Sequence, residues 1–275
     1  MKPTVHHLRM ALLLLAIAMG AVVADAAQLP FAEEIRRFAE LDRTAPEPVC
    51  GIVFVGDSSI RLWASLKVDM APLPVINRGF GGAQITDVNR NFGRLVSRHL
   101  PRAIVFYAGE NDLAAGVSPR TVFARFRRFM ALKTRRLGNT PVYFISVNPS
   151  PLRFDELGRQ SNLNDKVLGL SFRRTDLYYI DVVKPMMQDG MPKDIYIYDG
   201  LHMDDDGYAI WKDVVGAKLA QTGAAQRPCP KPPFLTWPGR IDRPLRRPVR
   251  PTARLPRAQR LSLTKGHAAA RRLAH

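Results

Sequence analysis

The sequence predicts an α/β domain in which a parallel sheet lies between two layers of helices. Two observations predict it. Short apolar runs alternate along the chain with longer amphipathic segments, and glycine or polar residues follow the end of each run. Strands that alternate with helices are typical of parallel sheets with right-handed crossovers. Because helices cover both faces, the strands of such a sheet are almost continuously apolar.

The domain begins with an amphipathic helix and a buried strand. Apolar residues recur at helical spacing over 31–41, which predicts a helix that packs on the domain. The apolar run 52–55 stops at Gly56-Asp57, which predicts a buried strand with Ser58 after its carboxyl end. Ligands of open α/β sheets bind at that end of the strands, so Ser58 is a candidate nucleophile. The alternative is that it caps the helix that follows.

A glycine-rich loop follows the second predicted strand. The strand covers 74–77, the loop is Arg78-Gly79-Phe80-Gly81-Gly82, and a helix is expected over 83–97. Glycines let the backbone turn tightly or let another group come close. The first N–H groups of a helix are free to bind an anion. Gly82 is therefore a candidate donor to a negative charge; the alternative is a simple tight turn.

Three more strands complete the predicted sheet, at 102–107, 141–145 and 177–182. Further helices are expected from Ser118-Pro119 onward, over 160–173, and after residues 204–207. Asn111 follows the third strand, whereas Asp199 and His202 follow the fifth after a loop of about seventeen residues. Parallel strands bring these loops to one edge of the sheet, where Ser58 and Gly82 also lie.

One histidine, His202, is expected near Ser58. His99 is expected at the opposite edge of the sheet. The remaining histidines lie in the end segments: His6, His7, His267 and His275. Histidine is the usual general base near neutral pH. Asp199 can accept a hydrogen bond from its other ring nitrogen and so fix its tautomer. The alternative is a capping cluster before the last helix, with His202 merely solvated.

Four blocks of the sequence resemble the SGNH or GDSL hydrolase family, over nearly the whole middle segment. They are Gly56-Asp57-Ser58, Asn77-Arg78-Gly79-Phe80-Gly81-Gly82, Gly109-Glu110-Asn111-Asp112 and Asp199-Gly200-Leu201-His202. The resemblance implies a three-layer α/β/α, flavodoxin-like domain with about five parallel strands that hydrolyses esters without metal or cofactor. It also implies Ser58 as nucleophile, Asp199 and His202 as its partners, and Gly82 and Asn111, with the Ser58 N–H, as oxyanion donors.

Together these features predict an exported serine esterase that hydrolyses carboxylic (acyl or acetyl) esters of small molecules, carbohydrates or lipids. A GxSxG elbow, a Walker loop and a GxGxxG pattern are absent from the sequence, which disfavours the other large hydrolase class and nucleotide chemistry. Two alternatives stay open: a polysaccharide O-deacetylase, and a non-catalytic exported sugar- or lipid-binding protein. Trp63, Phe80 and Tyr107 either stack on a sugar or pack in the core, and packing is favoured.

The ends of the chain differ from the middle. Lys2 and Arg9 precede an apolar run at 10–23 and a small-residue stretch, which predicts a signal peptide over 1–26 and export to the periplasm or the medium. An uncleaved membrane anchor is the alternative. The hydrolase domain is then expected over 27–225.

The last segment, 226–275, is rich in proline and arginine. It carries thirteen Lys or Arg and one acid, so +12 of the chain's net +17 lies there. Such a composition predicts disorder and attraction to anionic surfaces, for example of the cell envelope, without specific recognition of nucleic acid. The two cysteines, Cys50 and Cys229, are too few for a zinc site. The sequence leaves open whether they form a disulfide.

Overall fold

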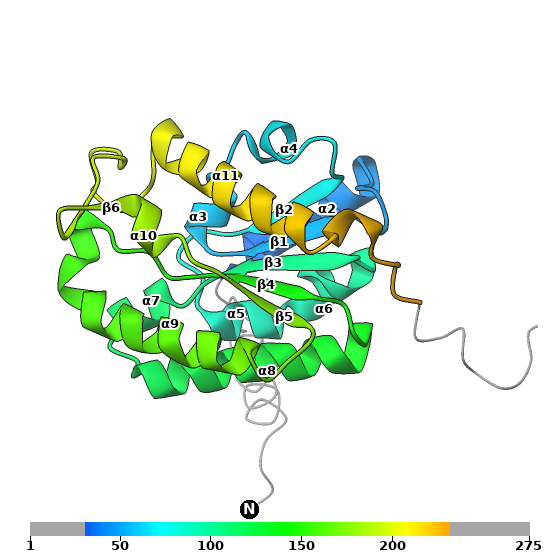
Figure 1. Cartoon of the computed structure of the whole chain (residues 1–275). Helices are drawn as coiled ribbons and strands as arrows, with labels where there is room; N and C mark the ends of the chain where they lie inside the picture. The colour runs from blue at the N-terminus through cyan, green and yellow to red at the C-terminus, as the bar shows by residue number, and fades with distance from the viewer. Residues whose placement is uncertain (1–30, 232–275) are drawn as a thin grey trace, which may run out of the picture. The chain divides into compact units, whose positions relative to one another are not determined.

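The computed structural model describes residues 31–231, and these form a five-stranded parallel sheet with helices on both faces (Figure 1). Its strand order is β2-β1-β3-β4-β5. The strands are β1 (Ile52–Gly56), β2 (Val75–Gly79), β3 (Ala103–Tyr107), β4 (Val142–Ile145) and β5 (Leu177–Ile180). The predicted fold class is confirmed. The predicted signal peptide over 1–26 lies outside the described residues. So does the predicted basic segment 226–275, except for residues 226–231, which continue the described fold past the disulfide-bonded Cys229.

Helices and short 3-10 turns connect the strands. In chain order they are α2 (Ala32–Thr44), α3 (Ser58–Arg61), α4 (Leu66–Asp69), α5 (Ile85–Arg90), α6 (Phe92–Leu95), η1 (Ser97–His99), α7 (Glu110–Ala114), α8 (Pro119–Leu137), η2 (Pro151–Glu156), α9 (Leu157–Ser171), α10 (Val183–Met186), α11 (Asp205–Gln221) and η3 (Ala224–Gln226). The longest, α8, begins as its sequence predicts: the Ser118 hydroxyl accepts the N–H of Thr121, and Pro119 opens the first turn.

Alternate residues of each strand point into two separate cores. In β1, Ile52 and Phe54 pack with the apolar faces of α3, α4, α10 and α11, whereas Val53 and Val55 pack with α5, α6, α8 and α9. Every residue of β1 and β3 is buried. Trp63, Phe80 and Tyr107 are at most 1% exposed, so the prediction that they pack in the core is confirmed.

Two connections differ from the predicted ones. The single helix expected over 83–97 is broken into α5, α6 and η1. At the break, the Asn91 side chain donates to the Asp87 carbonyl, 3.0 Å away, and such local bonds compete with the helical backbone pattern. The loop expected after β5 contains α10 and a hairpin of β6 (Met187–Gln188) and β7 (Met191–Pro192). Asp189 and Gly190 both have positive φ, as a two-residue hairpin turn requires.

A disulfide joins Cys50 and Cys229, whose Cα atoms lie 5.4 Å apart. Cys50 precedes β1 at the amino edge of the sheet, and Cys229 follows η3 after α11 has crossed back from the carboxyl edge. The bond therefore closes the described domain at the edge opposite to the polar loops. His99 lies at this amino edge, as predicted, where its carbonyl accepts the Cys50 N–H.

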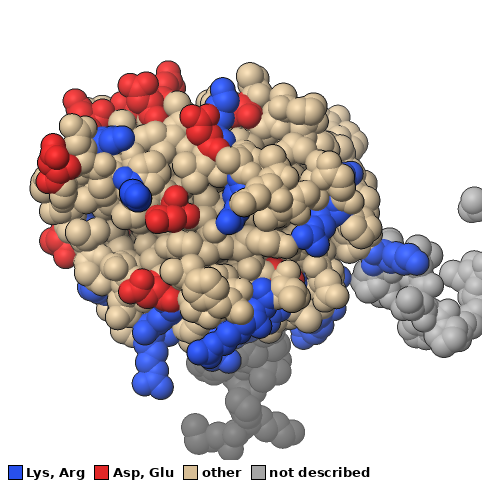
Figure 2. All heavy atoms as spheres, viewed as in Figure 1, with Lys and Arg blue, Asp and Glu red and all other residues tan. Residues whose placement is uncertain are grey.

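Charge is unevenly distributed over the face seen in Figure 2. Asp and Glu side chains gather at the upper left, where α11 begins and β6 lies in Figure 1, whereas Lys and Arg follow the lower edge along α8. The sequence of α8 contains seven Lys or Arg and no acid. Among residues 31–231, no helix is both long and apolar enough to cross a membrane.

Candidate active site

Ser58 lies at the first position of α3, directly beyond the carboxyl end of β1. At that end a Cβ on Gly56 would lie 1.7 Å from the Tyr107 carbonyl oxygen, so only glycine lets β1 and β3 approach this closely. Asp57, which lies between Gly56 and Ser58 in sequence, caps α3 by accepting the Ser59 N–H at 3.0 Å. Because Asp57 serves as the cap, the Ser58 hydroxyl is left free for another partner.

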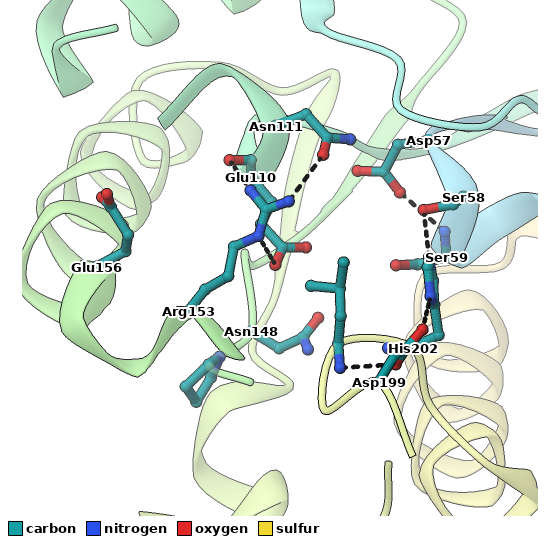
Figure 3. Close-up of polar contacts among 12 residues, drawn as sticks. Asp57, Ser58, Ser59, Glu110, Asn111, Asn148, Arg153, Glu156, Asp199 and His202 are labelled. Atoms are coloured by element: carbon teal, nitrogen blue, oxygen red, sulfur yellow. Dashed lines mark hydrogen bonds and ion pairs between the residues drawn. The ribbon is translucent and has the colours of Figure 1, made fainter. Parts of the chain in front are cut away.

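That partner is His202. Its Nε2 lies 2.9 Å from Ser58 Oγ, and its Nδ1 lies 2.6 Å from Asp199 Oδ2 (Figure 3). A carboxylate can only accept, so Nδ1 carries the proton and Nε2 presents a lone pair to the Ser58 hydroxyl. The side chains of His202 and Asp199 are 21% and 30% exposed. A substrate can therefore reach the imidazole.

A tight turn holds Asp199 and His202 in this relation. Asp199 Oδ1 accepts the N–H groups of Leu201 and His202, each at 2.9 Å, and Gly200, which directly follows Asp199, has a φ of 63°. Burial opposes ionisation of Asp199, but the hydrogen bonds from the His202 side chain and the two backbone N–H groups outweigh it and lower the pKa of its carboxyl. Asp199 is thus held as the carboxylate that can stabilise an imidazolium.

The two predicted oxyanion donors lie side by side across neighbouring loops. Gly82 has a φ of 69°, and within the described part of the chain its N–H has no hydrogen-bond partner. Asn111, in α7, donates its Nδ2 to the carbonyl of the adjacent Ala83 at 3.3 Å. Buried Asp112 supports this contact by accepting the Ile85 N–H at 3.0 Å, which ties α7 to the start of α5.

The chain matches proteins of known family in sequence and in structure. Residues 52–210 match the GDSL-like Lipase/Acylhydrolase family. This chain belongs to that family. No curated protein matches it in sequence. The match spans more than half of the chain and contains all five predicted site residues, so the resemblance seen in the four blocks is confirmed, and membership supports a hydrolase that acts on esters.

Solved structures share the fold of this GDSL-family chain. A GDSL-like lipase from Bacteroides thetaiotaomicron has a TM-score of 0.61 at 20% identity, covering 68% of this chain and 98% of its own. A lipase/acylhydrolase from Enterococcus faecalis has a TM-score of 0.51 at 20% identity, covering 66% and 100%. A carbohydrate esterase family 3 protein from Talaromyces cellulolyticus has a TM-score of 0.52 at 18% identity, covering 63% and 98%.

Side chains that the family blocks do not assign lie beside the site. Glu110, next to Asn111, is 6% exposed. Burial raises the pKa of its carboxyl to about 7, although Arg153, Tyr107 and His202 act in the opposite direction. Burial together with the charge of Glu110 also raises the pKa of Asp57 well above its usual range.

Arg153 and a buried chain of polar side chains complete the surroundings of Glu110. Arg153 Nε lies 3.7 Å from a Glu110 carboxylate oxygen. The Tyr107 hydroxyl donates to Asn148 Oδ1 at 2.6 Å, and the Asn148 amide donates to the Tyr196 hydroxyl at 3.3 Å. Within residues 31–231 no group of three His, Cys, Asp or Glu side chains is arranged to hold a metal ion.

These neighbours differ in how far a sequence motif could have pointed to them. Glu110 stands inside the third block, where a carboxylate between glycine and asparagine could have been noticed. Arg153, Asn148 and Tyr196 stand in connections without a motif, and only the packing of those connections brings them to the site.

Proposed function

We propose that this protein is an exported serine esterase that hydrolyses carboxylic, acyl or acetyl, esters. The observation that carries the proposal is the unbroken line of hydrogen bonds from Ser58 through His202 to Asp199, with donor-acceptor distances of 2.9 and 2.6 Å. A nucleophile, a base within its reach and a carboxylate that orients the base are the parts that acyl transfer needs.

The reaction follows from these positions. Ser58 Oγ attacks the ester carbonyl carbon while its proton passes to His202 Nε2, and Asp199 stabilises the imidazolium. The Ser58 and Gly82 N–H groups and the Asn111 amide donate to the oxyanion. The C–O bond to the alcohol then breaks, and His202 returns the proton to the leaving oxygen. Water, deprotonated by His202, cleaves the acyl-enzyme and restores the Ser58 hydroxyl.

Covalent labelling and ester hydrolysis test the proposal. A fluorophosphonate should label the wild-type protein but not Ser58→Ala. Ser59→Ala, which removes the buried hydroxyl next to the nucleophile, is the control and should be labelled. Without the label, the wild type and Ser59→Ala should hydrolyse a panel of acyl esters of graded chain length, with acetylated sugars included, and Ser58→Ala should not. Absence of both labelling and hydrolysis in the wild type would favour the non-catalytic binding protein. Hydrolysis confined to acetylated sugars would favour the O-deacetylase.

Export is supported by two features. The first 26 residues have the charge and apolar pattern of a signal peptide, and the Cys50–Cys229 disulfide suits an oxidising compartment. Fractionation of cells that express the full chain should place it outside the cytoplasm.

We propose further that the basic segment 226–275 holds the enzyme on anionic envelope surfaces. Truncation after residue 231 should abolish binding of the protein to anionic vesicles.

A further inference from the structure

Arg153 reaches from the 3-10 turn η2, just before α9, to the oxyanion side of the site. Its Nη2 lies 3.4 Å from Asn111 Oδ1 and its Nη1 lies 3.5 Å from the Glu110 carbonyl. The side chain is 18% exposed, and the Glu110 carboxylate lies 3.7 Å from Nε on the buried side. Figure 3 shows the guanidinium between Glu110 and Asn111, with the Asn111 oxygen turned toward it.

These contacts decide which way the Asn111 amide faces. A guanidinium can only donate, so the group that faces Arg153 must be the oxygen of the amide. A backbone carbonyl can only accept, so the group that faces Ala83, 3.3 Å away, must be the NH₂. If the amide were flipped, two donors would face each other at Arg153 and two acceptors at Ala83.

In the orientation that both neighbours favour, Nδ2 has one hydrogen on the Ala83 carbonyl and a second hydrogen left over. In Figure 3 the Asn111 nitrogen points away from Arg153, toward the side on which Ser58 lies. That second hydrogen is the one an oxyanion on Ser58 would accept. Preorganised donors of this kind stabilise a transition state because they need no reorientation as charge develops.

The backbone beside Arg153 is tied to the turn that carries the histidine. The Leu152 N–H donates to the Gly200 carbonyl at 2.9 Å, and the Arg153 N–H donates to the Ser150 carbonyl at 3.1 Å. Gly200 lies between Asp199 and His202 in sequence. Arg153 therefore links the Asp199–His202 turn to Asn111, the two sides of the site that come from β5 and β3.

We propose that Arg153 is a positioning residue that holds the Asn111 amide in the orientation required for oxyanion stabilisation, in register with His202. This inference rests on the proposed esterase function. It makes Arg153 important for the transition state rather than for binding of the ground-state ester, because the Asn111 donor gains its main partner only when charge develops on the carbonyl oxygen.

A double-mutant cycle tests the inference, with Arg153→Met, Asn111→Ala and the two combined. Arg153→Met should lower kcat by about 10- to 100-fold with little change in KM, and should weaken a boronic acid transition-state analogue by a similar factor. In the Asn111→Ala background the same change should have little further effect, since the amide it positions is absent. Arg153→Lys, which keeps one charged donor, should recover part of the loss.

Arg159→Met is the matched control. Arg159 is also a partly buried arginine that pairs with a carboxylate, Glu156 at 2.6 Å, and donates to a backbone carbonyl, but it does not touch the predicted site residues. It should keep wild-type kcat. Thermal unfolding of each variant identifies loss of fold, and if Arg153→Met does not fold, the cycle is run with Arg153→Lys.

The outcomes separate the two proposals. A wild type that neither hydrolyses esters nor reacts with a fluorophosphonate would overturn the esterase function and this inference with it. An active wild type in which the Arg153 and Asn111 effects multiply, or in which Arg153→Met matches Arg159→Met, would overturn the role of Arg153 alone. Equal rates for the double variant and Asn111→Ala would support it.

Discussion

Two aspartates hold the triad residues in place through bonds to the backbone. Asp57 caps α3, so the Ser58 hydroxyl is not needed as the cap and can bind His202. Asp199 uses Oδ1 for two backbone N–H groups and keeps Oδ2 for His202. Asp199 thus uses one carboxylate oxygen for the backbone of the turn and the other to orient His202.

Replacing Asn111 with alanine should lower kcat by about a hundredfold or more, because loss of one oxyanion donor typically has this effect. Stability should change by no more than about 1–2 kcal/mol, since the described side-chain bonds are two long ones, from Nδ2 to the Ala83 carbonyl and from Arg153 to Oδ1. Steady-state kinetics with a soluble ester measure the effect. Asn91→Ala, which removes a similar amide-to-carbonyl bond in the break between α5 and α6, should keep normal kcat. Equal rates for Asn111→Ala and wild type would remove Asn111 from the site.

Glu110→Gln should stabilise the protein more at pH 8 than at pH 5. Burial raises the pKa of Glu110 to about 7 in the folded protein, from a usual value of 4.5. Between these values the folded protein keeps a proton that the unfolded chain has lost, so wild-type stability falls as pH rises through this window. Glutamine cannot ionise, and the difference between the two pH values should be on the order of 2–3 kcal/mol.

Urea unfolding at both pH values measures this linkage. The matched control is Glu156→Gln, because Glu156 is a partly exposed carboxylate paired with Arg159 away from the triad. An equal change in stability at pH 5 and pH 8 for Glu110→Gln would show that Glu110 does not titrate in this range.

At the scale of the elements, short connections after adjacent strands place Ser58, Gly82 and Asn111. Gly56 joins β1 to the cap of α3, and the close approach of its Cα to the Tyr107 carbonyl sets the separation of β1 and β3 at their carboxyl ends. The sheet order places β1 between β2 and β3, so the loops that hold Ser58, Gly82 and Asn111 leave adjacent strands. This is the arrangement in which ligands of open α/β sheets bind.

Gly56→Ala should destabilise the fold by about 3 kcal/mol or more, because the new methyl group would overlap the backbone of β3 rather than a movable side chain. Denaturant unfolding measures the loss. Gly216→Ala is the control: Gly216 lies within α11, and a Cβ there meets nothing within 4 Å. That change should stabilise the protein by about 0.5–1 kcal/mol. Similar stability of the two variants would mean that β1 and β3 can separate without cost.

For the whole molecule, the site and the disulfide lie at opposite edges of one sheet. The Cys50–Cys229 bond spans a sequence separation of 179 residues, nearly the whole described domain. A cross-link over so long a loop strongly restricts the unfolded chain. Loss of the disulfide is therefore expected to lower the stability of the fold and to leave catalysis nearly unchanged.

Replacing both cysteines with alanine should lower the free energy of unfolding by about 2–5 kcal/mol. Below the lowered Tm, kcat should stay within about twofold of wild type, because the bond lies far along the sheet from Ser58. Thermal unfolding with and without a reducing agent measures the effect. Reduction should lower the Tm of the wild type and leave that of the double variant unchanged. A reductant-insensitive wild-type Tm would show that the bond does not stabilise the fold.

Much of the fold could be predicted from the sequence because its signals are local. Five apolar runs bounded by turn residues identify the strands, and the edge at which their loops meet follows from parallel topology. The break at Asn91 and the β6–β7 hairpin were not predicted, since one depends on a competing side-chain bond and the other on a two-residue turn inside an irregular connection.

The sequence by itself determined the family, the parallel sheet and the residues expected at its carboxyl edge, because the four blocks that resemble the family stand in order at the ends of apolar runs. Tertiary structure alone decided the pairing of Cys50 with Cys229 and the contact of the Asn111 side chain with Arg153. Arg153 lies 42 residues from Asn111 in sequence, in a segment without a motif. The packing of that segment against the Asp199–His202 turn brings its guanidinium to the amide oxygen, and no local pattern encodes such a contact.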